Sequence, residues 1–127
     1  MGRRRIQRRS RYTCIMSDCL FCKIIEGVIP ADIVFRNENV VAFNDLNPQA
    51  PTHVLLIPTL HTENAAGVAR NSATITADLF LAADQIANDR GLNGYRTVFN
   101  TGEDAGQTVF HAHLHLLGGR PMAWPPG

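Results

Sequence analysis

Three histidines occupy alternate positions near the C-terminal end of the 127-residue chain, at His111, His113 and His115. Side chains alternate between the two faces of a β-strand, so a strand here would present all three on one face. That pattern suits a metal site, because histidine pairs on strands bind metal ions. It also suits nucleophilic or acid–base catalysis, because the histidine pKa lies near neutrality. The opposite face is apolar and is predicted to be core: Phe110, Ala112, Leu114 and Leu116.

The loop that precedes these histidines favours chemistry on a phosphate. Gly102 and Gly106 let backbone N–H groups approach a ligand, and three side chains add neutral donors: Asn100, Gln107 and Thr108. Such groups can cradle a phosphate without lysine. Few carboxylates accompany them that could complete a catalytic metal site. From the residues alone we favour chemistry on a phosphate, and a metal site stays open as the alternative.

The three cysteines, Cys14, Cys19 and Cys22, form no disulfide framework, because their number is odd and they cluster at one end. Cys19-x-x-Cys22 is half of a possible zinc site, since two thiolates on one turn can bind one tetrahedral ion. Two more ligands are needed. No apolar stretch typical of a secretory signal follows the N-terminal arginines, so we expect a cytoplasmic protein with reduced thiols.

Apolar runs bounded by glycine, proline or polar turns predict five strands, over residues 33–36, 40–43, 53–57, 95–100 and 108–117. Apolar residues at helical spacing predict a long helix over residues 72–90, with Ile75, Leu79, Ala82 and Ile86 on its buried face. A short helix is expected over 21–26, and residues 61–72 are expected to be irregular. Short connections between strands imply antiparallel pairing, which predicts an α+β domain.

The composition is that of one globular domain, with 45% hydrophobic residues and no apolar run long enough to span a membrane. The net charge of +1 conceals an uneven distribution. Six of the twelve basic residues are arginines before residue 17. The rest of the chain holds the other six basic residues and all eleven acidic ones. We expect an acidic domain over 18–127 that does not bind nucleic acid. Residues 1–17 are expected to be a disordered tail. Met16 is an alternative translation start within this segment. The other interpretation of the segment is a functional basic arm.

The chain from about residue 18 to 127 resembles the nucleoside phosphoramidase (Hint) branch of the histidine triad (HIT) family. The resemblance is carried by the His-x-His-x-His motif with its two following apolar residues, and by the segments 21–25, 45–53 and 118–127. It implies a five-stranded antiparallel sheet with one long and one short helix, continued across a homodimer. It also implies hydrolysis of purine nucleoside 5′-phosphoramidates through a covalent nucleotidyl-histidine intermediate, with no cofactor required for catalysis.

The resemblance assigns roles by position. His113 would be the nucleophile. His115 would hydrogen-bond the phosphate and assist proton transfer to the leaving amine. His53 would orient the triad, and His111 would be its third histidine. The nucleotide contacts would be Asn100, Gly106, Gln107 and Thr108 for phosphate, Asp45 for ribose, Phe21, Ile24 and Leu46 for the purine, and Trp124 across the dimer. Other branches bind structural zinc at positions that correspond to Cys19, Cys22, His61 and His111.

The chain departs from the Hint pattern at a few positions. Thr108 stands where serine is usual and keeps the hydroxyl, whereas Asn44 and Ala123 stand where histidine is usual. Two other functions stay open. One is a non-catalytic nucleotide-binding or scaffold protein, and the other is a dinucleoside polyphosphate hydrolase. The Trp-Pro-Pro-Gly end of the chain argues against the latter, because that sequence is typical of the phosphoramidase branch.

Overall fold

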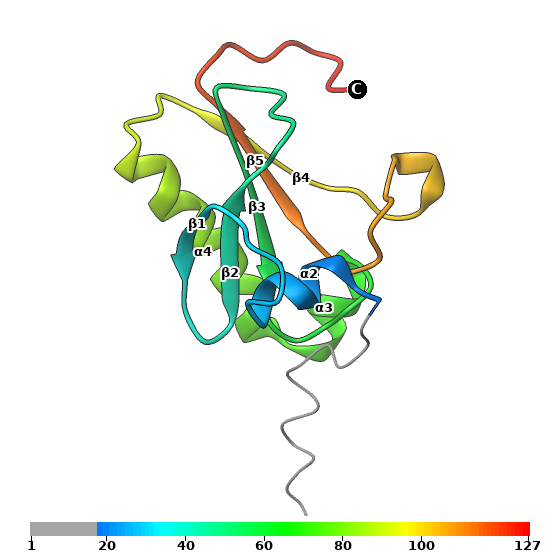
Figure 1. Ribbon diagram of the computed structural model, residues 1–127. Coiled ribbons are helices and arrows are strands. Elements are labelled where there is room, and N and C mark those ends of the chain that lie inside the picture. The colour runs from blue at the N-terminus through cyan, green and yellow to red at the C-terminus, as the bar shows by residue number, and fades with distance from the viewer. Residues whose placement is uncertain (1–17) are drawn as a thin grey trace, which may run out of the picture.

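The computed structural model describes residues 18–127 (Figure 1). The expectations for residues 1–17, including Cys14 and Met16, lie outside the described residues. Within the described part, one antiparallel sheet has the strand order β1-β2-β3-β5-β4. Its strands are β1 (Ile33–Arg36), β2 (Val40–Asn44), β3 (Thr52–Pro58), β4 (Tyr95–Phe99) and β5 (Leu114–Gly118). The predicted α+β class and the five strands are confirmed. No helix among residues 18–127 is long and apolar enough to cross a membrane.

The long helix α4 (Ala73–Asp89) begins where the sequence predicts, because the Ser72 side chain accepts a hydrogen bond from the Ile75 N–H at 3.0 Å. The short helix α2 (Leu20–Ile25) is also present. The expectation of irregular chain over 61–72 was wrong, because a third helix, α3 (Ala65–Asn71), lies there. This helix was not predicted from the sequence because it is short and contains a glycine in its interior. That residue, Gly67, is required by packing, since a Cβ there would meet the Thr62 methyl at 2.9 Å.

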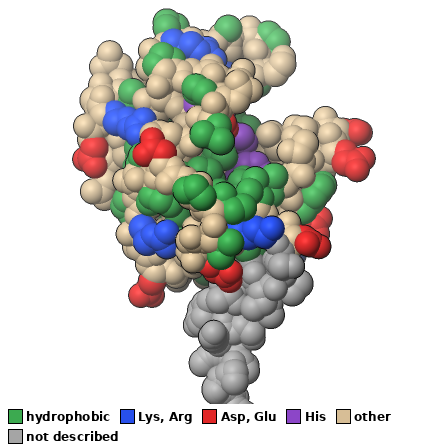
Figure 2. Space-filling model, viewed as in Figure 1, with side chains coloured by type: hydrophobic (Ala, Val, Ile, Leu, Met, Phe, Trp, Pro, Cys, Tyr) green, Lys and Arg blue, Asp and Glu red, His purple; other side chains and the backbone are tan. Residues whose placement is uncertain are grey.

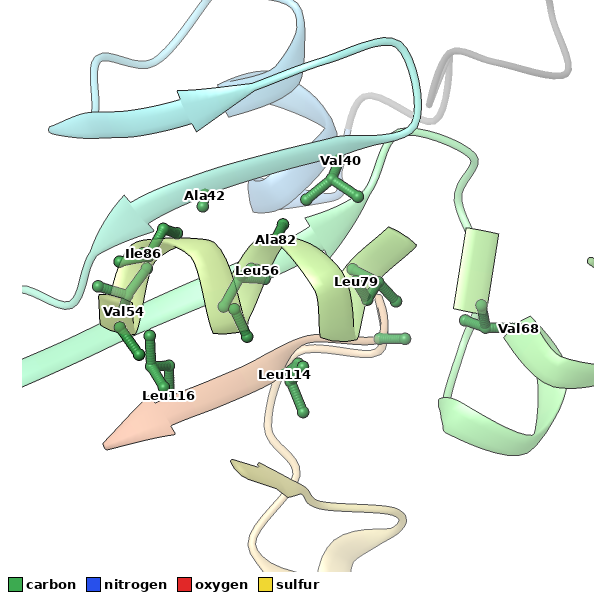
Figure 3. Close-up of a cluster of buried hydrophobic side chains, with 13 residues drawn as sticks. Val40, Ala42, Val54, Leu56, Val68, Leu79, Ala82, Ile86, Leu114 and Leu116 are labelled. Atoms are coloured by element: carbon green, nitrogen blue, oxygen red, sulfur yellow. The ribbon is translucent and has the colours of Figure 1, made fainter. Parts of the chain in front are cut away.

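Helix α4 covers one face of the sheet, and the main core lies between them (Figure 3). The predicted helix face is confirmed: Leu79, Ala82 and Ile86 are buried, and Ile75 packs against them at the edge. A second apolar cluster lies on the opposite face, beneath α2, and joins Phe21 and Ile24 to residues of β2 and β3. Strand β3 is consequently buried along its whole length. Because α2 is short, the rest of this second face is left for a cleft.

The histidine segment differs from the prediction. Strand β5 begins only at Leu114, and residues 109–111 form a bend before it. The Ala112 N–H donates to the Thr62 carbonyl at 2.7 Å, which draws this segment away from the sheet ladder. Leu114 and Leu116 are buried as expected, but Phe110 is 43% exposed and does not belong to the core. Only His115 of the three histidines therefore lies within a strand. The Phe21 ring packs against both His111 and His113, so the histidine rings still lie on the α2 side of the sheet, opposite Ala112, Leu114 and Leu116.

Candidate catalytic cleft and Cys/His cluster

A chain of hydrogen bonds fixes which nitrogen of each of two histidines carries the proton. The backbone N–H of Gln49 donates to Nδ1 of His53 at 3.0 Å, so this nitrogen is an acceptor and Nε2 bears the hydrogen. His53 Nε2 then donates to Nδ1 of His115 at 2.9 Å. His115 must in turn carry its hydrogen on Nε2. That Nε2 is buried and makes no hydrogen bond to any described residue, so its N–H is available to a ligand.

His113 is held with the opposite polarity. Its Nδ1 donates to the backbone carbonyl of His111 at 2.9 Å, which leaves Nε2 as the unprotonated nitrogen. The edge of the Phe21 ring packs against His113 with centroids 5.0 Å apart, and the His115 ring lies at 5.1 Å. The cleft thus holds a nitrogen lone pair on His113 and an N–H donor on His115 side by side. An imidazole lone pair of this kind is a nucleophile at neutral pH.

Burial keeps the imidazoles of His53 and His115 neutral. It lowers the pKa of His115 to about 4, and the neighbouring His113 and His53 act in the same direction while Asp45 opposes them. Burial also lowers the pKa of His53, against the attraction of Asp45, whose Oδ2 lies 3.4 Å from His53 Nε2. Both rings are therefore uncharged at pH 7.

Asp45, His53 and His115 also lie close enough to share a metal ion. The hydrogen bonds argue for a relay instead. A metal would need the lone pair of His53 on Nε2, and its proton on Nδ1 would then meet the Gln49 N–H.

The cleft has a volume of about 380 Å³, within the range of small-molecule sites. Figure 2 shows histidine side chains at the floor of a hollow with hydrophobic side chains beside it. Most residues expected from the sequence line this cleft: Phe21, Ile24, Asp45, Leu46, Asn100, Gly106, Thr108, His113 and His115. Leu46 is 98% exposed and forms only an outer rim. The tertiary structure thus brings together an apolar wall, one carboxylate and a polar end.

Some expected residues lie elsewhere. His53 is buried behind His115 and reaches the cleft only through it. Gln107 is 3% exposed. Its amide accepts from the Gly102 N–H at 2.8 Å and donates to the carbonyls of Glu63 at 2.8 Å and Val109 at 3.1 Å. Both its N–H groups are engaged, so the side chain holds the loop rather than a ligand. Trp124 is 81% exposed, beside Arg96 and outside the cleft lining.

Sequence reasoning missed some residues that shape the site. Phe43 and Leu55 are cross-strand partners that complete the apolar wall, and the alternation of β2 and β3 could have indicated them. Gln49 contributes through its backbone N–H and not through its side chain. No residue-type pattern could have revealed that contact, because every residue except proline carries the same donor.

The side chain of His111 points into a second cluster, with Cys19, Cys22 and His61. Its Nδ1 lies 3.4 Å from Cys19 Sγ and 3.1 Å from His61 Nδ1, and Cys22 Sγ lies 3.3 Å from that His61 nitrogen. Ligands of a tetrahedral zinc are separated by roughly 3.3–3.8 Å, given bond lengths near 2.0–2.3 Å. The donor separations therefore match a tetrahedral zinc site. Cys22 is disulfide-bonded in this structure, contrary to the expectation of reduced thiols, so it would bind zinc only after reduction to a thiolate.

Two further features of His111 suit it to a metal. Its Nε2 donates to the Pro58 carbonyl at 2.8 Å, which leaves the lone pair on Nδ1, the atom that faces the cluster. The ring is fully buried, and burial lowers its pKa to about 4 despite the Pro58 contact. A neutral histidine with a second-shell acceptor is the form that binds metals.

The chain is similar to known proteins over most of its length. The model of the HIT domain family matches residues 26–122. A solved HIT family hydrolase from Legionella pneumophila is 49% identical, with a TM-score of 0.83 over 87% of this chain and 100% of that one. A histidine triad nucleotide-binding protein from Candida albicans is 29% identical, with a TM-score of 0.73 over 85% of this chain and 83% of that one. A 14 kDa zinc-binding protein of Zea mays is 45% identical over 87% of this chain and 89% of its own length. The chain therefore belongs to the HIT domain family.

Proposed function

We propose that this protein hydrolyses purine nucleoside 5′-phosphoramidates, with Nε2 of His113 as the nucleophile. One observation carries the proposal: the backbone carbonyl of His111 and the Gln49–His53 relay give His113 and His115 opposite tautomers within one cleft. A lone pair and an N–H donor side by side suit attack at phosphorus, with stabilisation of the charge that develops there. Similarity to a HIT family hydrolase and to a histidine triad nucleotide-binding protein supports the proposal.

The reaction proceeds by two displacements. Nε2 of His113 attacks the α-phosphorus, the P–N bond breaks, and the leaving nitrogen takes a proton from solvent to depart as an amine. Water then attacks phosphorus, the P–Nε2 bond breaks, and one proton returns to solvent with the free nucleotide. His115 donates a hydrogen bond from Nε2 in both steps. It keeps its proton, because a neutral imidazole that accepts from His53 would otherwise become an anion.

The nucleotide lies along the cleft in this proposal. The purine contacts Phe21 and Ile24 on the apolar wall, and Asp45 accepts hydrogen bonds from the ribose hydroxyls. Asn100, Gly106 and Thr108 surround the phosphate, beside the two catalytic histidines. Gln107 supports that loop without touching the nucleotide.

A structural zinc completes the proposal. Cys19, Cys22, His61 and His111 would hold it, supported by the donor separations and by similarity to a zinc-binding protein. The ion would join α2 to the segment before β5, and it takes no part in the reaction as proposed. Zinc binding would require Cys22 as a reduced thiolate, a form that a reducing compartment maintains, and we place the protein in the cytoplasm.

A homodimer is the remaining element. Strand β4 is one edge of the sheet, and Tyr95 on it is 40% exposed. Pairing of two β4 strands would continue the sheet into a second copy and cover this edge. Trp124, exposed beside β4 in one subunit, would then be able to reach the leaving group in the other.

The deciding experiment measures release of amine and AMP from an adenosine 5′-phosphoramidate by the wild type and by His113→Ala. The wild type should turn over and the variant should lose at least ~10³-fold in kcat/KM, because no other lone pair is in place. Circular dichroism checks that the variant folds. An inactive wild type that still binds AMP would indicate a non-catalytic nucleotide-binding protein. Faster cleavage of a dinucleoside polyphosphate would indicate a hydrolase of that other class.

A further inference from the structure

We propose that Arg120 and Gly119, just after β5, are positioning residues that hold the His53–His115 relay in its productive tautomer. The proposal rests on the proposed function only for its effect on turnover, because the tautomer itself can be measured without substrate. Neither residue lines the cleft, so both would act through the β2–β3 loop, residues 45–51, which leads into His53 on β3.

Arg120 holds this loop by its backbone. Its guanidinium Nη2 donates to the carbonyl oxygen of Gln49 at 3.1 Å, and Nη1 donates to the Pro121 carbonyl at 3.2 Å. The fork therefore ties the C-terminal segment to residue 49, which lies 71 positions earlier in the chain. Gln49 is also the residue whose N–H donates to Nδ1 of His53. A clamp on the Gln49 carbonyl restricts rotation of the residue that supplies this N–H.

Gly119 lets the two segments approach. Its φ is +92°, in the region that favours glycine, and a Cβ added there would meet the Pro51 Cβ at 2.8 Å. Any other residue would both strain the backbone and push the C-terminal segment away from Pro51. The close contact with Pro51 and the Arg120 clamp on Gln49 fall on the same short loop, two residues apart, just before β3. Two independent contacts thus fix the loop that orients His53.

The orientation of that loop decides the chemistry of His115. With the Gln49 N–H in place, His53 carries its proton on Nε2 and presents it to Nδ1 of His115. Without it, Nδ1 of His53 gains access to water and the alternative tautomer becomes available. His53 would then accept from His115 Nδ1, and His115 would lose the N–H on Nε2. The buried donor that faces the cleft would become an acceptor, repelling the oxygens of a phosphate.

The test compares Arg120→Met, Arg120→Lys and Gly119→Ala with the wild type. Two-bond ¹H–¹⁵N spectra of histidine-labelled protein report which nitrogen of His53 and His115 is protonated. We expect a single Nε2–H tautomer for both in the wild type, and a mixture with Nδ1–H in Arg120→Met and Gly119→Ala. Lysine can make one of the two hydrogen bonds, so Arg120→Lys should lie between. Arg70→Met is the matched control, because Arg70 is an exposed arginine on α3, far from this loop in sequence.

Turnover is measured on the same variants. In Arg120→Met and Gly119→Ala, kcat on an adenosine phosphoramidate should fall by about tenfold, part of the ~10²-fold cost of losing one hydrogen-bond donor to the phosphoryl oxygens. KM should stay within about threefold, since the apolar wall is untouched. Unchanged tautomers in both variants would overturn the proposal, whether or not kcat falls. A tautomer change without loss of turnover would also overturn it. An inactive wild type with the expected tautomer change would refute the proposed function and leave the positioning role standing.

Discussion

His113 donates a hydrogen bond from Nδ1 to the backbone carbonyl of His111, with the two atoms 2.9 Å apart. The two side chains nevertheless lie in different sites. His113 lines the cleft, whereas His111 is buried in the Cys/His cluster. The main chain of His111 therefore orients the proposed nucleophile while its ring anchors the same segment. The chemistry of the cleft and the stability of the cluster are coupled through one residue.

The cluster should bind zinc with structural consequences. Protein purified without added metal should contain roughly one zinc per chain, and Cys19→Ser should contain much less. Removal of the metal should lower the free energy of unfolding by at least ~2 kcal/mol, because the ion joins α2 to the segment before β5. Elemental analysis and thermal unfolding with and without a chelator measure both quantities. Metal-free protein with an unchanged melting temperature would contradict the prediction.

The His53 side chain should contribute to turnover without contacting the nucleotide. In His53→Asn, Nδ1 of His115 loses its fixed donor at 2.9 Å, so the His115 proton is free to move from Nε2. We expect kcat to fall by ~10²-fold, the cost of losing one hydrogen-bond donor to the phosphoryl oxygens. Affinity for AMP should change by less than about fivefold, because the purine and ribose contacts remain. Steady-state kinetics and calorimetric AMP titration separate these effects. A variant that loses AMP binding as strongly as turnover would show that His53 holds the cleft itself.

The midpoint of the His115 titration should lie far below pH 7. Burial lowers its pKa to about 4 from the ordinary 6.5, so the ring stays neutral in the folded protein down to about pH 5. Between pH 6.5 and 4 the unfolded chain takes up a proton that the folded chain does not. The free energy of unfolding therefore decreases as the pH is lowered from 6.5 to 4. NMR titration of the His115 ring gives the midpoint directly. His115→Asn should lose less stability than the wild type on acidification from pH 7 to 5. Equal losses in the two proteins would contradict the assignment.

Gln107 should hold together the loop before β5, residues 101–108, which we propose surrounds the phosphate. Gln107→Glu replaces the N–H donors that face the Glu63 and Val109 carbonyls with oxygen, so two acceptors lose their partner and meet a charge. We expect a loss of about 1–3 kcal/mol in the free energy of unfolding and weaker AMP binding. Denaturant titration and AMP calorimetry measure the two effects. Weaker AMP binding at unchanged stability would instead indicate direct contact of this side chain with the nucleotide.

Much of the architecture follows from local pattern. The spacing of Leu79, Ala82 and Ile86 predicts the buried face of α4, and Ser72 marks its start, because helix periodicity and capping depend on neighbouring residues. Helix α3 escaped this reasoning because its interior glycine reflects a close approach to Thr62, a contact set by packing. The limit of β5 escaped it for the same reason. Alternation predicts that the strand extends back through His111. In the structure the chain bends before β5, where Ala112 bonds the Thr62 carbonyl and the His111 side chain joins the Cys/His cluster.

The sequence by itself determined which residue types are available: three alternating histidines, a glycine-containing loop and a Cys-x-x-Cys pair, in an acidic domain of α+β pattern. Only the tertiary structure decided their use. It turned His111 toward the cysteines and His113 toward the cleft, and it buried Gln107 behind the loop. It also set the tautomers of His53, His113 and His115 through backbone N–H and carbonyl groups. Those groups are common to nearly every residue, so their directions emerge only when distant segments of the chain are packed together.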